Sequence, residues 1–509
     1  MAGRARRTLA AAAAALAAWA LAPAGCSSVE TEGTNWSCSS DADCSGGKLC
    51  SRAFDPEGDR VLSPLKRCVA PDAAPIVIGV SGLQVEKSWD VGVEGCVRRV
   101  NERLDGGDRI GGHPLRVRQA PYDIAAFNPA GAGDQYAKFL GLLDADAGSA
   151  PGPNAVDALY GFLQLEPEVV RQLGTVGGKD VVLFGASDGN ASYREQPPEN
   201  LYFYRPSALE EMGAIVDSIF ASGVSDPKSV YVTRWAGVSA DLFDAFRVAW
   251  NSNRGRPAAA PQIADEGSLG GFELHDPRLP TGPGGTYFDH VLVLLAAGYE
   301  TAYASPALDA FLATPGPGPL AVVVLDGPAD AAGFLLGLNN RLRGPVEGRP
   351  EVPALDGSLL TRLRFYAGSG TSLMGPIIAT QPGGASDLLK RSRVAGATPD
   401  PDGASALAQA YQRDVAVQRS QLGFEAYLGC VYYVEALRES VRRFGNVAPG
   451  SLRQVFADFT ADIGLGPMSI SAARNYASPT VYLYEYPEGD PFGDRLRGTW
   501  TRDDGLVLF

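Results

Sequence analysis

The chain has 509 residues, of which 45% are hydrophobic and 20% are charged, and its formal net charge at pH 7 is −14. The length predicts two or three domains, and the composition is that of a globular protein rather than a disordered one. The acidic balance argues against a nucleic-acid partner, because phosphates require a basic face. Only three histidines occur, and no His/Cys/Glu spacing indicates a metal site, so neither acid–base chemistry nor a bound metal is expected.

Residues 1–25 have the pattern of a signal peptide. Three arginines precede an apolar run from Leu9 to Leu21, which is too short for a comfortable membrane span. The run ends at Pro23–Cys26, which resembles a bacterial lipoprotein signal, although that pattern prefers leucine where Pro23 stands. We therefore expect a periplasmic or cell-surface protein anchored by a lipid on Cys26, and Ser27 favours the outer membrane. Plain secretion is the alternative.

Six cysteines remain after Cys26. Four of them lie in residues 26–73, a segment with few large apolar residues that cannot fold unaided, so two disulfides are expected there, with three possible pairings. Zinc is the rival, but the spacing and the export signal disfavour it. Cys96 and Cys430 lie on two predicted helices and form either a third bridge or two buried thiols. The four cysteines of the N-terminal segment are Cys38, Cys44, Cys50 and Cys68.

From residue 74 onward, short apolar strands alternate with amphipathic helices. This alternation predicts parallel sheets covered by helices on both faces, and two such sheets are needed to hold this many units. The segment 276–300 fits a helix or a strand equally well. Strands are expected at 76–80, 115–117, 158–160, 181–184, 230–232, 321–325 and 363–366, and helices at 93–104, 209–220, 242–250, 329–342 and 424–442.

Five short motifs occur in the order found in one family. They are Ile76–Gly82, Arg109–Leu115, Asn200–Ser207, Phe424–Tyr427 and Ala477–Tyr484. In this order they resemble the type I periplasmic binding proteins, most closely the substrate-binding component of branched-chain amino acid ABC transporters. The resemblance covers about residues 74–509.

The resemblance implies an α/β fold of two doubly wound parallel-sheet lobes joined by a multi-strand hinge, with a small Cys-rich module in front and no cofactor. It divides the chain into six parts. These are the signal peptide 1–25, the linker and Cys-rich module 26–73, lobe one 74–206, lobe two 207–392, a second part of lobe one 393–475, and a return to lobe two 476–509.

Ligands of open parallel sheets sit beyond the carboxyl ends of the strands, where helix N-termini offer free N–H groups. By the resemblance, Ser187 and Asp188 would bind an amino-acid carboxylate, Trp89 would form an aromatic wall, and Asp326 would pair with an ammonium group. Helix capping and plain packing are the alternatives. The candidate ligand-binding residues are Trp89, Gly161, Phe162, Gln164, Ala186, Ser187, Asp188, Arg234, Asp326, Ser369 and Thr371.

One stretch departs from the family. Residues 162–166 lack the paired hydroxyl residues with which the family clamps a carboxylate, so this stretch does not supply that half of an amino-acid pocket. The expected function is capture of a small, polar, amino-acid-like ligand by hinge closure, with presentation to an ABC permease. Sensing or protein interaction on the same fold is the alternative. An exported enzyme is disfavoured, because Gly368-Ser369-Gly370 is not a nucleophile elbow and Gly106–Gly111 lacks dinucleotide spacing.

Overall fold

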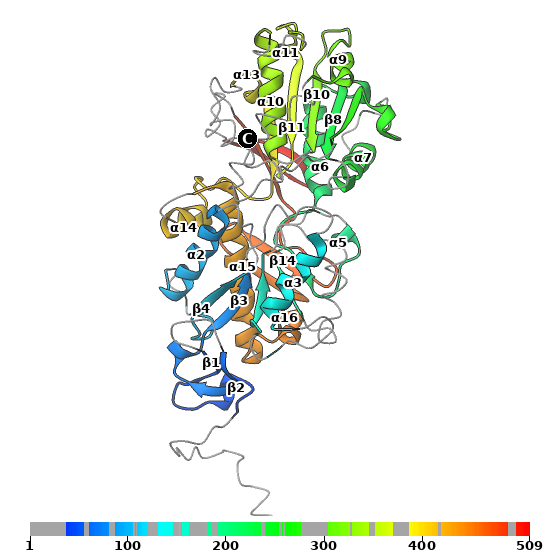
Figure 1. The fold of residues 1–509 in the computed structure, drawn as a ribbon. Helices are drawn as coiled ribbons and strands as arrows, with labels where there is room; N and C mark the ends of the chain where they lie inside the picture. The colour runs from blue at the N-terminus through cyan, green and yellow to red at the C-terminus, as the bar shows by residue number, and fades with distance from the viewer. Residues whose placement is uncertain are drawn as a thin grey trace, which may run out of the picture.

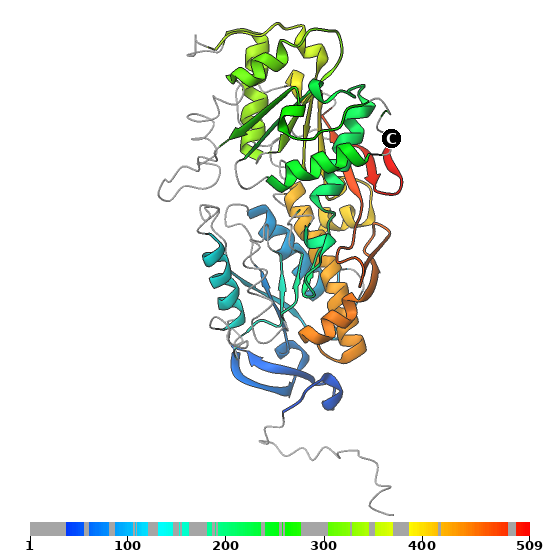
Figure 2. The same ribbon diagram turned by 90° about the vertical axis from the view of Figure 1, so that its right-hand side faces the viewer.

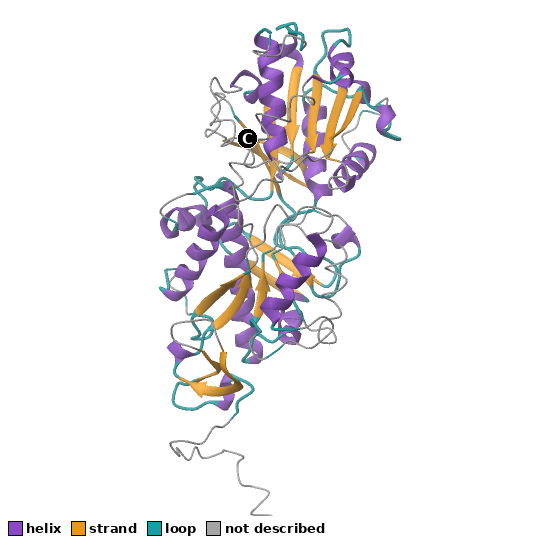
Figure 3. Cartoon of the chain, in the orientation of Figure 1, coloured by secondary structure: helices purple, strands orange, loops and turns teal. Residues whose placement is uncertain are grey.

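Two α/β lobes stand end to end above a small N-terminal module in the computed structural model (Figure 1). Helices flank the sheet of each lobe (Figure 3). The structure describes residues 37–54, 61–80, 87–104, 107, 109–120, 131–145, 152, 155–161, 181–185, 189, 192–235, 240–253, 257, 260–275, 304–325, 328–345, 352–369, 386–415, 419–486 and 495–509. The predicted signal peptide, Cys26 and the segment 276–300 lie outside these residues.

Lobe one is built on a five-stranded parallel sheet in the order β4-β3-β5-β6-β7. Strand β3, the second in this order, is buried at every residue, which suits the unbroken apolar run in its sequence. The strands are β3 Ile76–Val80, β4 Leu115–Gln119, β5 Ala158–Tyr160, β6 Leu183–Phe184 and β7 Leu201–Tyr202. The helices of this first part are α2 Lys87–Asn101, α3 Gly131–Leu143 and α5 Ser192–Glu195.

A later part of the chain completes lobe one. Its longest helix, α15 (Gln421–Phe444), begins where the Ser420 side chain accepts a hydrogen bond from the Gly423 N–H, and it ends at Gly445, whose φ of 66° is left-handed. Most residues of α15 are buried, so this helix lies in the core of the lobe. The other elements are α14 Ala406–Asp414, α16 Pro449–Phe456, β13 Asp458–Asp462 and β14 Pro467–Ser471.

Lobe two contains an eight-stranded sheet in the order β17-β16-β15-β12-β11-β10-β8-β9. The five strands from β9 to β12 run parallel, whereas β15, β16 and β17 are antiparallel additions. Of these, β15 overlaps the Ala477–Tyr484 motif, which resembles the family's closing strand, and β16 and β17 were not predicted. The strands are β8 Val230–Trp235, β9 Gly271–His275, β10 Leu320–Leu325, β11 Leu363–Ala367, β12 Ser392–Gly396, β15 Val481–Glu485, β16 Arg495–Thr501 and β17 Gly505–Leu508. The helices are α6 Ala208–Ala221, α7 Ala240–Ser252, α9 Pro306–Leu312, α10 Pro328–Arg343, α11 Leu359–Arg362 and α13 Ser386–Leu389.

The described part of the chain crosses between the lobes three times: after β7, after β12 and after β14. Two crossings lie side by side, because Phe203 bridges Tyr476 in parallel and the Phe203 N–H donates to the Asn475 carbonyl oxygen at 2.8 Å. The predicted fold class, two doubly wound lobes with a multi-strand hinge, is confirmed, with the correction that the second sheet is mixed.

The N-terminal module is a hairpin of β1 (Leu49–Phe54) and β2 (Val61–Val69) with two disulfides. The pairing is Cys38–Cys50 and Cys44–Cys68, so the four sulfurs are used in bridges rather than in a zinc site. Arg52 fixes the module to lobe one through Asp157 at 2.5 Å. No helix in the described part of the chain is long and apolar enough to cross a bilayer.

A third disulfide joins Cys96 of α2 to Cys430 of α15. It decides between the two alternatives for these residues and links the two sequence segments of lobe one. Both cysteines are fully buried.

Replacing both with alanine (Cys96→Ala/Cys430→Ala) should lower the free energy of unfolding by about 2–4 kcal/mol, because the bridge closes a long loop in the unfolded chain. Chemical denaturation measures this. The pair Cys38→Ala/Cys50→Ala is the control, since its bridge spans a sequence separation of only 12 within the module and should leave the unfolding of lobe one unchanged. An unchanged midpoint for the Cys96/Cys430 variant would contradict the prediction.

Candidate functional site

The carboxyl end of β5 carries an aromatic pair. Gly161 follows this strand with a φ of 71°, and a Cβ there would lie 3.0 Å from Cζ2 of Trp89. The Trp89 ring is fully buried and stacks on Tyr160, with ring centroids 6.4 Å apart. Trp89 therefore lies in the first turn of α2 rather than in the loop where the sequence placed it. The burial and stacking of Trp89 are those of a packing residue, and they neither support nor contradict a contact with a ligand.

The indole N–H of Trp89 has no acceptor among the residues that the structure describes. A buried donor left unpaired costs about 1–3 kcal/mol. This donor lies at the carboxyl end of the lobe-one sheet, where open α/β sheets bind their ligands.

Tyr160 links this edge to α15. Its hydroxyl donates to the carbonyl oxygen of Ala426 at 2.6 Å. Burial raises the pKa of Tyr160 well above its ordinary value, and the charge of Glu425 raises it further. The phenol consequently stays protonated and acts as a donor.

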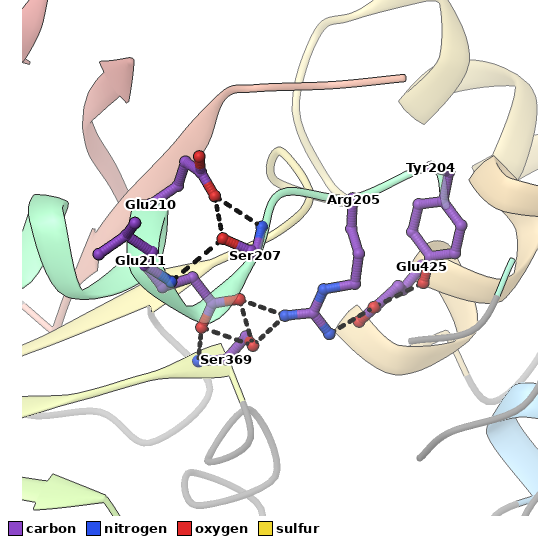
Figure 4. Close-up of polar contacts among 8 residues, drawn as sticks. Tyr204, Arg205, Ser207, Glu210, Glu211, Ser369 and Glu425 are labelled. Carbon is purple, nitrogen blue, oxygen red and sulfur yellow. Dashed lines mark hydrogen bonds and ion pairs between the residues drawn. The ribbon is translucent and has the colours of Figure 1, made fainter. Parts of the chain in front are cut away.

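A buried polar cluster lies at the first crossing (Figure 4). One of its members, Glu425, directly precedes Ala426 in the sequence. The Arg205 guanidinium donates to Glu425 of α15 at 3.1 Å and also to Glu211 of α6 and to the Ser369 hydroxyl. The Tyr204 hydroxyl donates to the same Glu425 oxygen at 2.6 Å. We call these five residues the junction cluster: Tyr204, Arg205, Glu211, Ser369 and Glu425.

Ser369 comes two residues after β11 and binds Glu211 twice. Its backbone N–H donates to one carboxylate oxygen at 3.0 Å, and its hydroxyl lies 2.8 Å from both. One guanidinium thus connects lobe one, through Glu425, to α6 and the end of β11 in lobe two (Figure 4).

The electrostatics hold the junction cluster in one protonation state. Burial alone would lower the pKa of Arg205, but the carboxylates of Glu211 and Glu425 outweigh it and hold this pKa above its ordinary value. Burial, followed by the charge of Glu425, raises the pKa of Tyr204 well above its usual range. Arg205 therefore stays charged and Tyr204 stays neutral at any physiological pH.

The start of α6 is fixed by a capping box. The Ser207 side chain accepts from the Leu209 N–H, and the Ser207 N–H donates to Glu210 at 2.9 Å. Glu210 also pairs with Arg502 at 2.8 Å. This cap sets the direction of the first helical turn and so aims the adjacent Glu211 at the junction cluster.

No protein-family model and no curated protein matches the chain. Solved structures match it over most of its length. One is a possible leucine/isoleucine/valine-binding protein from Rhodopirellula baltica, 15% identical, with a TM-score of 0.56, covering 86% of this chain and 100% of that one. Another is an extracellular ligand-binding receptor from Verminephrobacter eiseniae, 16% identical, with a TM-score of 0.55 and coverages of 83% and 99%.

A third is a fatty acid ABC transporter substrate-binding protein from Thermomonospora curvata, 14% identical, with a TM-score of 0.53 and coverages of 86% and 92%. The chain has the type I periplasmic binding protein fold. At this level of identity the likeness is one of fold, and the similar structures are described as binding proteins rather than enzymes.

The periplasmic binding protein fold brings some of the predicted residues together. Trp89 contacts Gly161 at the edge of lobe one, and Ser369 joins the junction cluster. Arg234 lies at the carboxyl end of β8 in lobe two, where its guanidinium stands over the Phe272 ring and 3.3 Å from Glu266. The remaining candidates lie outside the described residues: Phe162, Gln164, Ala186, Ser187, Asp188, Asp326 and Thr371.

Sequence reasoning missed Arg205, Glu211 and Glu425 as a unit. A signal was present, because both glutamates lie inside apolar helical stripes, where a buried carboxylate requires a cation. Arg205 belongs to the Asn200–Ser207 motif, which the resemblance places at the crossing of this fold.

Arg205→Met should lower the free energy of unfolding by about 3–5 kcal/mol, because it leaves two buried carboxylates without their cation. Chemical denaturation measures the change. Arg442→Met is the matched control, since Arg442 is 70% exposed and its solvent-screened pair with Glu439 should contribute little to stability. Equal losses in the two variants would show that the junction cluster does not hold the lobes.

Proposed function

We propose that this chain captures a small carboxylate-bearing ligand, amino-acid-like in character, between its two lobes and delivers it to an ABC permease. The observation that carries the proposal is the buried indole N–H of Trp89 at the carboxyl end of the lobe-one sheet, for which no described residue provides an acceptor. Such a donor favours a ligand oxygen as its acceptor.

Lobe two supplies the opposite wall in this proposal. Ser369 follows β11 at the carboxyl end of the second parallel sheet and joins the junction cluster from that side. The other candidate residues extend the proposed site around the same strand ends, namely Gly161, Phe162, Gln164, Ala186, Ser187, Asp188, Arg234, Asp326 and Thr371.

Hinge closure is the proposed mechanism. The lobes are joined by three crossings, and Arg205 binds partners on both sides of the first of them. Rotation about this buried pivot would bring the two sets of strand ends together and shield the ligand from water. No step forms or breaks a covalent bond, and no cofactor is required.

The similar structures support the ligand class. One is described as a possible leucine/isoleucine/valine-binding protein and another as a fatty acid transporter component. Amino acids and fatty acids share a carboxylate, which accepts hydrogen bonds from indole and hydroxyl donors. The absence of paired hydroxyls at 162–166 argues for a clamp built from other donors, of which Trp89 is one.

We also propose that the protein works at the periplasmic face, held by a lipid on Cys26. The signal-like residues 1–25 and the disulfide-linked module behind them support this placement, because disulfides persist in oxidising compartments. Sensing on the same fold would use the same capture step with a different partner.

Titration calorimetry against aliphatic amino acids and short fatty acids should show saturable heat for at least one of them. Small-angle scattering should then show a smaller radius of gyration with that compound bound. The matching carboxamide is the control, and it should bind at least about tenfold more weakly. No heat from any carboxylate, together with an unchanged radius, would refute the proposal.

Trp89→Phe should weaken binding of that compound about tenfold, because it deletes the N–H and keeps a stacking ring. The control is Trp250→Phe, which removes a similar ring volume in lobe two, where the indole N–H donates to Pro261 at 3.0 Å. Both variants should lose stability, but only the first should lose affinity. If Trp250→Phe weakens binding equally, Trp89 is a packing residue only.

A further inference from the structure

A groove of about 900 Å³ lies on lobe two between α6, the end of α7 and the β16–β17 hairpin. The hairpin, red in Figure 2, stands at the side of the lobe. The groove shares no residue with the junction cluster, so the proposed ligand site does not account for it. Its lining includes Leu209, Phe220, Trp500, Leu506 and Leu508 as the large apolar side chains.

One border of the groove is a free sheet edge, because β17 is the last strand of the eight-stranded sheet. The Phe509 N–H donates to the Arg497 carbonyl, and Val507 pairs with Thr499 in the same register. In an antiparallel ladder the residues between such pairs direct their backbone groups away from the partner strand. Leu506 and Leu508 therefore present their N–H and C=O groups outward, where no described strand pairs with them.

This edge is also unusually apolar. Val507 is 46% exposed and Leu508 is 49% exposed. Edge strands are normally protected by charges, proline or a covering segment, because their open backbone groups invite another strand. Gly505–Leu508 contains neither a charged residue nor a proline.

The floor and rim of the groove are acidic. Asp217 is held in place by the Trp500 indole N–H at 2.7 Å and by the Asn253 amide at 2.6 Å. Asp503 and Asp504 lie in the exposed hairpin turn beside it. Arg502, the one cation among the described lining residues, pairs with Glu210. Three aspartates thus line the groove beside its apolar side chains.

We infer that β17 and this groove bind an extended segment of a partner protein in which basic and apolar residues alternate. The segment adds to β17 as a further strand, so its backbone pairs with Leu506 and Leu508, and its basic side chains reach the three aspartates. A second copy of this chain fits less well, because it would bring the same aspartates and a net charge of −14.

The probe is a fluorescein-labelled peptide of alternating lysine and valine, four repeats long, added to the full chain. Fluorescence anisotropy should rise to saturation and fall as salt is added. A peptide with glutamate in place of lysine should bind at least about tenfold more weakly, as should one N-methylated on the pairing edge. Absence of saturable binding by the lysine peptide, or equal binding by either control peptide, would overturn the inference.

Protein variants separate backbone pairing from charge. Leu508→Pro removes an outward N–H and should weaken binding at least tenfold relative to Leu508→Ala, which loses the side chain alone. Asp503→Lys should weaken it similarly, whereas Glu102→Lys, an exposed charge reversal on lobe one, should not. Equal binding by the proline and alanine variants would overturn strand addition. A concentration-dependent dimer abolished by Leu508→Pro in sedimentation would assign the edge to a second copy instead.

Discussion

The buried guanidinium of Arg205 is the contact on which the joint between the lobes depends. Removing one arginine and two glutamates from water costs several kcal/mol per ion, and only complete hydrogen bonding recovers this cost. Here the Glu425 carboxylate accepts hydrogen bonds from Tyr204 and Arg205, and the Glu211 carboxylate accepts hydrogen bonds from Arg205 and Ser369. Because the partners come from both lobes, sliding one lobe past the other would leave buried charges unpaired. Rotation about the guanidinium keeps them paired, so the cluster favours a hinge over a shear.

Helix α15 connects this joint to the rest of lobe one. Within six residues it places Glu425 in the junction cluster, the Ala426 carbonyl under Tyr160, and Cys430 against α2. Trp89 lies on α2 and stacks on the same Tyr160. A helix with three fixed attachments therefore relates the indole N–H, which has no acceptor among the described residues, to the crossing between the lobes. In the proposed function, this one helix would set both the position of a ligand at that donor and the angle between the lobes.

The sequence predicted the elements whose signals are local. The runs at 76–80 and 321–325 are buried strands because nearly every residue is apolar, and the helical stripe at 424–442 falls inside α15. Strands β16 and β17 were missed because these antiparallel strands are partly exposed, so they lack the continuous buried apolar run of the parallel strands. The junction cluster was missed for a different reason. Arg205 and Glu425 are separated by 220 residues, so their pairing depends on tertiary structure that no local pattern contains.

Helix α6 contributes to both proposed sites of lobe two. Its first turn delivers Glu211 to the junction cluster, and its later turns line the groove with Gly213, Asp217 and Phe220. The capping box connects the junction cluster to the groove, because Glu210 fixes the start of α6 and also binds Arg502 of the hairpin turn. A strand bound to β17 would hold Arg502 and the hairpin against α6. Closure of the lobes would act on the other end of the same helix, through Glu211. Two sites that share one rigid helix are coupled to the extent that its position differs between the open and closed forms, and that coupling acts equally in both directions.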